Sequence, residues 1–244
     1  MPAPAQKGQQ FIVQLVMLSL PLHLWANLVA YGTAVSLSPL HIGLLLLLLL
    51  GQEPLRRASW FVLSWMLTIL AMLALFLSLG HRFLPDSSPG AAHGTITDLL
   101  AAGALLALGL HRLLSHSTAG AEPPDWTHQL DRFGALPLPL LIAISSGLEA
   151  ISPDDLFLVA KSASNLLAAG LRRPQELLGM GVLTVAASLS LLLPLGALAL
   201  NRHSILPRLE QAKKLLYANG DLLVGGLSLG LAGYLGWQGI TGLA

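Results

Sequence analysis

Apolar runs long enough to cross a lipid bilayer recur along the chain, and no other feature constrains the fold so strongly. A membrane-spanning helix needs about 20 mostly apolar residues, and runs of this kind include 11–51, 59–79 and 175–200. Only 10% of the 244 residues are charged, against about 25% in a soluble domain. The sequence therefore predicts an all-α polytopic membrane protein without a sizeable soluble domain.

Charge and cysteine content exclude several classes of function. The formal net charge is +1, so nothing indicates nucleic-acid binding. The chain has no cysteine, which excludes disulfides, thiolate metal sites and thiol-relay chemistry. Near the N-terminus, Pro21, His23, Trp25 and Asn27 make a poor cleavage site, so we expect an uncleaved first span rather than a signal peptide.

Two of the apolar runs are interrupted by a Ser-Pro pair. Run 11–51 contains Ser38-Pro39, and run 134–170 contains Ser152-Pro153. Proline ends one half-helix and suits the first position of the next, and serine is a good N-cap. A single proline is more simply explained as a kink, which spanning helices tolerate. The matched pair instead favours two discontinuous helices that meet near the midplane of the membrane.

The two breaks indicate an internal repeat, because each is followed by a half-helix, an arginine pair and a span. We predict a first repeat over 1–115 (with an N-terminal extension, 1–23), a polar linker over 116–132 and a second repeat over 133–244. With about six spans, the basic loop residues are distributed more unequally between the two sides of the membrane than with eight. The positive-inside rule therefore favours six. Six spans give two inverted three-helix repeats with both termini outside. Whether 11–23 forms a separate span stays open.

The remaining elements are placed by composition. We expect a basic loop at 52–57, a span at 59–79 with Trp60 and Trp65 at the membrane interface, and a loop at 81–93. Further spans are expected at 95–110, 175–200 and 222–243, with a basic interfacial connector at 201–217. The last span is rich in glycine, which lets helix backbones approach closely.

The second break carries most of the ionisable side chains: Glu149, Asp154, Asp155 and Lys161. Asp155 also occupies the acidic position of a Ser-x-x-acid capping pattern, so a helix cap is an equally good explanation of the acids. Apolar sequence on both sides, however, places these groups at bilayer depth, where an ionisable residue is a functional hypothesis by default.

Helical spacing puts Asp154, Lys161 and Asn165 on one face, and Glu149 could join them across the break. We interpret this set as a cation or proton site. The alternatives are a buried neutralising pair, or a Lys161 side chain that reaches toward the interface.

His41 occupies the equivalent first turn after Ser38-Pro39. Inverted symmetry would bring it near Asp155, and an imidazole beside carboxylates suits proton coupling, although a lone histidine is more often a satisfied polar residue. A metal site through His41, Glu149, Asp154 and Asp155 is compatible with the sequence but unspecific. We therefore predict no metal site and no cofactor. The histidines at 81, 93, 111, 116, 128 and 203 fall in or near loops and should be solvated.

The segments SLSPLHIGLLLLLLLG and RRASWFVLSW resemble the opening of the GAP family, the lipid-addressing (Sap) branch of the lysine-exporter (LysE) superfamily. Residues 148–196 and the tail NGDLLVGGLSLGLAGYLGWQGI are similar to the same family, so the resemblance covers 25–244. It implies a six-span inner-membrane protein of exporter type. Relatives often have Asn-Pro-Lys at the second break, where this chain has Ser152-Pro153-Asp154-Asp155, which puts the substrate in doubt.

Three functions follow in decreasing order of support. The first is a secondary exporter of a small molecule, a lipid-related metabolite or an ion, multi-pass in a bacterial cytoplasmic (inner) membrane. The second is a non-transporting accessory protein of a lipid-export complex. An enzyme comes last, because no catalytic motif is present. The expected partners are the lipid bilayer and the substrate, and a homo-oligomer stays open. The proposed substrate- or ion-binding residues are Ser38, Pro39, His41, Glu149, Ser152, Pro153, Asp154, Asp155, Lys161 and Asn165.

Overall fold

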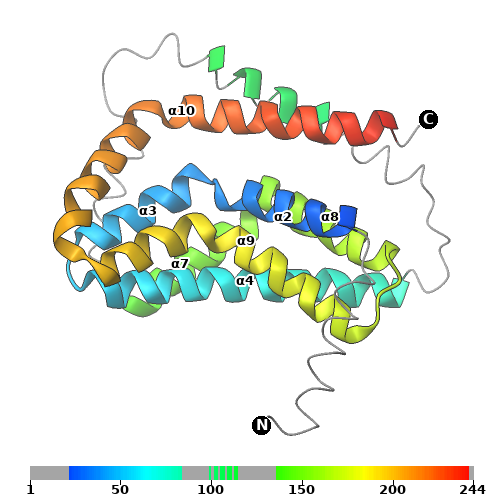
Figure 1. Cartoon of the computed structure of the whole chain (residues 1–244), viewed down its shortest axis with the longest axis horizontal. Helices are drawn as coiled ribbons and strands as arrows, with labels where there is room; N and C mark the ends of the chain where they lie inside the picture. The colour runs from blue at the N-terminus through cyan, green and yellow to red at the C-terminus, as the bar shows by residue number, and fades with distance from the viewer. Residues whose placement is uncertain are drawn as a thin grey trace, which may run out of the picture.

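The computed structural model describes residues 22–83, parts of 99–114, and 136–241. All regular elements within these residues are helices, and their labels follow Figure 1. In chain order they are α2 (Leu22–Ser36), α3 (Pro39–Leu50), α4 (Pro54–Phe83), α7 (Leu138–Ile151), α8 (Pro153–Ala168), α9 (Arg173–Leu200) and α10 (Arg202–Thr241).

Two of the described helices are long and apolar enough to span a membrane, namely Pro54–Arg82 in α4 and the whole of α9. At about 1.5 Å per residue each exceeds the ~30 Å hydrocarbon core. The pair α2 and α3 makes a third candidate if it counts as one span bent by 60°. Half of the expected span 95–110 and the whole linker 116–132 lie outside the described residues. The described part therefore holds two or three candidate spans, and the six-span arrangement stays a prediction.

Both expected helix breaks are present, and their backbones are nearly identical. Ser38 has φ −62° and ψ 112°, and Ser152 has φ −63° and ψ 112°. This extended conformation follows from the prolines, which disfavour helical geometry in the preceding residue. Each serine carbonyl accepts the first hydrogen bond of the next half-helix, from Ile42 at 3.1 Å and from Leu156 at 2.9 Å.

The serines occupy the N-cap positions, but neither side chain makes a capping hydrogen bond. The predicted N-cap positions are therefore confirmed at both breaks, without the side-chain hydrogen bond that usually accompanies them. At Ser38 the physical reason is visible, because its hydroxyl is bonded to the His41 ring instead.

Helices α4 and α9 run antiparallel in the lower half of Figure 1. Helices α2 and α3 lie on the side of this pair that faces α10. Helix α2 packs on α9 and α8. Gly32 permits its close approach, since a Cβ atom there would lie 2.7 Å from Ala186 Cβ and 2.8 Å from the Leu183 carbonyl oxygen. The first half of one broken helix thus contacts the second half of the other.

The leucine run of α3 is enclosed by protein. Leu44 to Leu49 are all buried, because α3 packs against α4, α9 and α10. A helix that is apolar on all sides lies either within protein or in a membrane, and here protein surrounds it. The large apolar side chains that remain exposed, and so can meet lipid, include Leu63, Leu67 and Leu75 of α4 and Val185, Leu189 and Leu193 of α9.

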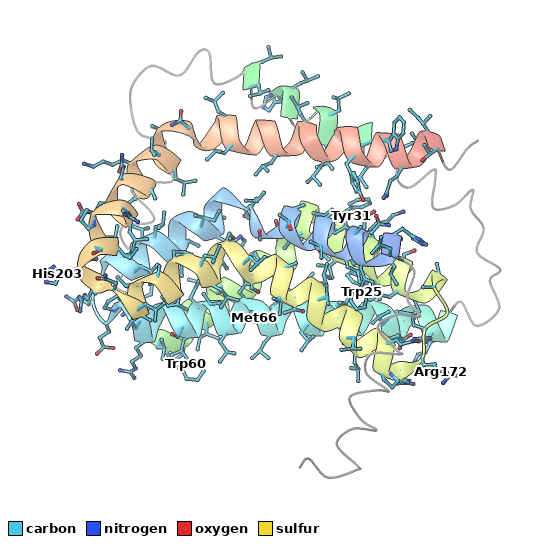
Figure 2. All side chains as sticks on the ribbon, in the orientation of Figure 1. Trp25, Tyr31, Trp60, Met66, Arg172 and His203 are labelled. Carbon is cyan, nitrogen blue, oxygen red and sulfur yellow. The ribbon has the colours of Figure 1, made fainter. Side chains whose placement is uncertain are left out.

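The basic loop predicted at 52–57 is mostly helical, and the arginine pair that follows the second half-helix lies at the start of α9. Helix α4 already begins at Pro54 and α9 at Arg173, because proline suits the first turn of a helix. Arg57 donates a hydrogen bond to the Leu136 carbonyl oxygen just before α7. Arg172 and His203, at the N-terminal ends of α9 and α10, mark opposite ends of the bundle (Figure 2).

His81 is exposed, as expected, but it lies in a helix and not in the predicted loop 81–93. It belongs to the last turn of α4, and its Nε2 lies 2.9 Å from Glu176 Oε1 in the first turn of α9. The side chain of His81 is 48% exposed and that of Glu176 is 10% exposed. The predicted loop began too early because α4 extends to Phe83, which brings His81 within reach of this carboxylate.

Helix α10 is bent at Asn219, whose φ is −123° and ψ is 15°. The predicted connector 201–217 and the predicted last span from 222 fall on opposite sides of this bend. Three of its glycines, at 225, 236 and 239, approach segment 99–114; a Cβ at Gly239 would lie 2.7 Å from the Leu99 side chain. Gly226, Gly230 and Gly233 meet nothing within 4 Å. The close-packing role predicted for the glycines therefore holds for one face of the helix.

Candidate functional site

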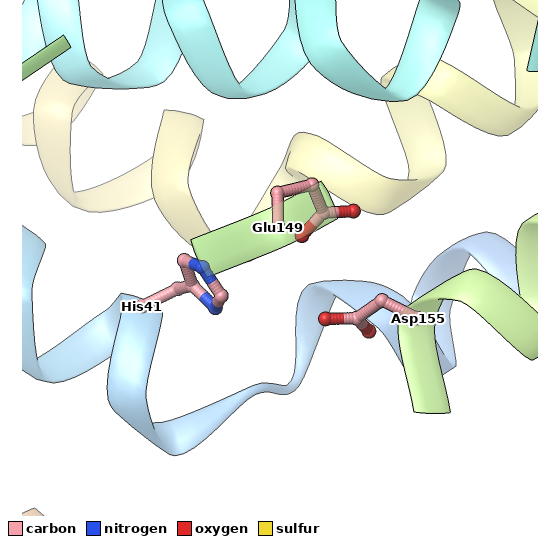
Figure 3. Close-up of side chains that lie close together, drawn as sticks. All are labelled: His41, Glu149 and Asp155. Atoms are coloured by element: carbon pink, nitrogen blue, oxygen red, sulfur yellow. The ribbon is translucent and has the colours of Figure 1, made fainter. Parts of the chain in front are cut away.

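Three ionisable side chains from three helices converge beside the helix breaks: His41 of α3, Glu149 of α7 and Asp155 of α8 (Figure 3). Each offers one nitrogen or oxygen atom, and these atoms all lie within 4.8 Å of one another. All three residues are at most 2% exposed. We call this set the break cluster.

The sequence positions of the cluster follow from the geometry of the breaks. His41 and Asp155 are each the third residue after a break serine, so they occupy equivalent first-turn positions in α3 and α8. Glu149 lies in the last turn of α7, three residues before Ser152. The helix after each break therefore contributes one first-turn side chain, His41 from α3 and Asp155 from α8. The helix before the second break, α7, adds Glu149.

His41 is held by two neighbours. Its Nδ1 shares a hydrogen bond of 2.8 Å with Ser38 Oγ. Its ring lies edge-on to Trp65 of α4, with ring centroids 4.0 Å apart and an interplanar angle of 61°. The buried Nε2 has no hydrogen-bond partner among the described residues. Trp65 itself is fully buried, so the expectation that it marks the membrane interface is wrong.

The cluster brings two carboxyl groups close together in a buried setting. Two like charges at short range disfavour full ionisation, and burial disfavours the charged form further. Both costs fall when a cation or a shared proton lies between the carboxyl groups. The arrangement is therefore suited to binding a positive charge and releasing it again.

The remaining predicted site residues are placed differently. Lys161 and Asn165 are half-buried, and Lys161 lies about 120° around α8 from Asp155. The buried face of α8 instead carries Asp155, Leu158, Ser162 and Leu166. Pro39 and Pro153 begin α3 and α8. The side chains of both prolines and of Asp154 lie outside the described residues, so the predicted stripe of 154, 161 and 165 stays a prediction.

A second polar group between α2 and α10 was missed at the sequence level. Tyr31 donates a hydrogen bond to Gln238 Oε1 at 2.8 Å, and Tyr234 donates to Asn27 Oδ1 at 2.7 Å. Gln238 Nε2 also donates to Asn27 Oδ1 at 3.1 Å. Figure 2 shows Tyr31 on the side of α2 that faces α10. Asn27 and Gln238, two amide side chains within apolar runs, could have predicted this group, because buried amides need hydrogen-bond partners.

Comparison with known proteins identifies the family. A family model described as Sap, sulfolipid-1-addressing protein, matches residues 28–241. No curated protein and no solved structure matches the chain. The matched region includes both breaks and every residue of the break cluster. The chain, a membrane protein with apolar helices, therefore belongs to the Sap, or sulfolipid-1-addressing protein, family.

Proposed function

We propose that this protein is a secondary transporter, an exporter with its substrate or ion site at the two Ser-Pro breaks. In this proposal it is multi-pass in a bacterial inner membrane, with six spans arranged as two inverted three-helix repeats. The observation that carries the proposal is the buried meeting of His41, Glu149 and Asp155 from both broken helices. Transporters commonly build their sites from discontinuous helices at the interface between repeats.

The position of the breaks supports this assignment. They lie between the two ends of α4, which is long enough to cross the hydrocarbon core (Figure 1). Ionisable residues at such depth are expensive and mark pathways for substrates or ions. The matching backbone angles at Ser38 and Ser152 further support two related halves.

A buried cluster of variable charge can couple ion binding to a change in helix arrangement. When the cluster holds a cation or proton, the repulsion between Glu149 and Asp155 falls and α7, α8 and α3 can pack closely. When the charge leaves, the same repulsion favours separation of these helices. A difference in free energy between two arrangements is what a coupled transporter requires.

A lipid-related cargo has two supports. One is the description of the family, which names a sulfolipid-addressing protein. The other is an open groove between α4 and α7, lined mainly by apolar side chains that include Leu67, Met72 and Ile142. The lining hydroxyls of Ser64 and Thr68 bond to carbonyl oxygens of their own helix. The groove thus presents an apolar surface that suits an acyl chain.

The test is deletion of the gene in its own bacterium, followed by complementation. Surface lipids and the culture medium are profiled by mass spectrometry. The wild-type chain and a Glu176→Gln control should restore the exported compound, whereas Asp155→Asn and Glu149→Gln should not. Glu176 is a suitable control because it is also a buried carboxylate near a histidine, but it lies outside the break cluster. Full restoration by both cluster variants, at equal protein levels in the membrane, would refute the proposal.

Reconstitution separates a transporter from an accessory protein. The compound identified by profiling is loaded into proteoliposomes that contain the purified chain, and its movement is followed with time. A transporter should move it, and Asp155→Asn should not. Absence of flux, together with co-purification of a larger complex from cells, would instead assign the chain an accessory role in lipid export.

A further inference from the structure

We propose that the break cluster binds a first-row divalent transition-metal ion such as Zn²⁺ or Mn²⁺, through the His41 imidazole and the carboxylates of Glu149 and Asp155. The sequence alone did not favour a metal site, because it could not show that enough ligands converge. The structure supplies that convergence, with one donor atom from each residue inside a 4.8 Å group. The inference names an ion for the site of the proposed function. Metal binding itself does not depend on that function, whereas a role of the ion in transport rests on it.

The ligand set determines the class of metal. Imidazole suits zinc, iron, nickel and copper, whereas carboxylates suit harder ions such as manganese. A site with one nitrogen and two carboxylate ligands therefore favours first-row divalent ions over Mg²⁺ and Ca²⁺, which prefer oxygen ligands throughout. The absence of cysteine from the chain removes the thiolates that select Cu⁺. A divalent ion also neutralises the two carboxylates it would touch.

The histidine is arranged as a metal ligand usually is. A ligating histidine normally donates its second ring N–H to a neighbouring acceptor, which fixes the ring orientation and the tautomer. In the tautomer that binds metal through Nε2, His41 Nδ1–H donates to Ser38 Oγ, 2.8 Å away. Nε2 is then the free nitrogen, and it is the one without a partner among the described residues. The Ser38 hydroxyl is left available for this bond because it makes no capping bond.

The number of protein ligands among the described residues, three, indicates an exchangeable ion. Structural zinc sites are closed by four protein ligands, whereas sites that act on a substrate have three and keep a position open. Three ligands from three separate helices also mean that a shift of any one helix would change the coordination. Ion release would therefore be linked to the relative movement of α3, α7 and α8.

The experiment measures metal binding by the purified full-length protein in detergent, independently of transport. Co²⁺ is added as a coloured probe, and its visible absorption reports coordination by protein ligands; Zn²⁺ is then added as a competitor. We expect one Co²⁺ per chain, displaced by Zn²⁺ and not by Mg²⁺. His41→Ala, Glu149→Gln and Asp155→Asn should each weaken binding by at least about 10-fold, an effect known even for residues that only support a ligand. Glu176→Gln and His81→Ala should bind as the wild type does.

Thermal unfolding distinguishes a folded variant that has lost metal binding from a variant that does not fold. Zn²⁺ should raise the Tm of the wild type and of the two controls, because a ligand that binds only the folded state stabilises it. At the same Zn²⁺ concentration it should raise the Tm of the folded cluster variants less, in line with their weaker binding. Wild-type protein that binds no Co²⁺, or cluster variants that bind it normally, would overturn the inference. Metal binding without flux would refute only the transport proposal, and flux without metal binding would refute only the metal site.

Discussion

The two helix breaks have the same backbone and different chemistry. Ser38 and Ser152 differ by one degree in φ and share the same ψ. The third residue before each serine is Val35 in the first break and Glu149 in the second, and both are buried. The third residue after it is His41 in the first and Asp155 in the second. The prolines thus impose one shape on both halves, while the side chains make the two halves unequal.

This difference separates the scaffold from the site. The scaffold is repeated because each of the two Ser-Pro pairs places an extended serine before a new helix start. The charges are concentrated on the second half, with a single imidazole from the first half facing them. The site therefore needs side chains from both breaks, and neither break alone supplies it.

The largest effect is expected when the second break is made like the first. Glu149→Val copies Val35 and leaves one carboxyl group in the cluster. We expect transport and Co²⁺ binding to be lost, while the free energy of unfolding is unchanged or rises, because one of two neighbouring buried carboxyl groups is removed. Chemical denaturation in detergent and the transport assay measure the two effects. A variant that transports normally would show that the asymmetry of the breaks has no functional meaning.

A second test compares glycines that precede the two breaks. A Cβ at Gly32 would overlap Ala186 and the Leu183 carbonyl, whereas a Cβ at Gly147 meets nothing within 4 Å. We expect Gly32→Ala to destabilise the protein by about 1–3 kcal/mol through overpacking. Gly147→Ala should be neutral or stabilise by up to about 1 kcal/mol, since alanine favours helix. Equal Tm values for both variants would contradict the close contact of α2 with α9.

The smallest effect is expected from the hydroxyl beside His41. Ser38→Ala removes one side-chain hydrogen bond, worth about 0.5–1.5 kcal/mol of folding stability. Its larger consequence should be weaker Co²⁺ binding, by about 10-fold, because the ring loses the group that orients it. Ser36→Ala is the matched control, since the Ser36 hydroxyl donates to the Thr33 carbonyl of its own helix and lies outside the break cluster. Identical Co²⁺ affinity in both variants would show that Ser38 does not orient the ligand.

Local chemistry explains which parts of this structure were predictable. The breaks at Ser38 and Ser152 follow from proline geometry, which depends on neighbouring residues alone. The proximity of His41 to Asp155 was predicted from the hypothesis of inverted halves, in which equivalent first-turn positions would lie near each other. The enclosure of α3 could not, since a run of leucines looks the same whether it faces lipid or protein.

Long-range packing accounts for the other misses. The pairing of His81 with Glu176 depends on where two helices end, and helix ends are poorly marked in continuous apolar sequence. The burial of Trp65 depends on its position opposite the break, which only the three-dimensional arrangement reveals. Local patterns carry neither kind of information.

The hydrogen bonds between α2 and α10 have a consequence for biosynthesis. Tyr31 and Gln238 are 207 positions apart, as are Asn27 and Tyr234. A ribosome therefore delivers these hydrogen-bond partners of α2 only after 207 further residues have been made. Until then the amide of Asn27 must rely on water, lipid headgroups or an insertion factor. The first broken helix thus completes its hydrogen bonds only after α10 has been made. A chain that stops before Tyr234 would expose unpaired polar groups of α2 to quality-control proteases.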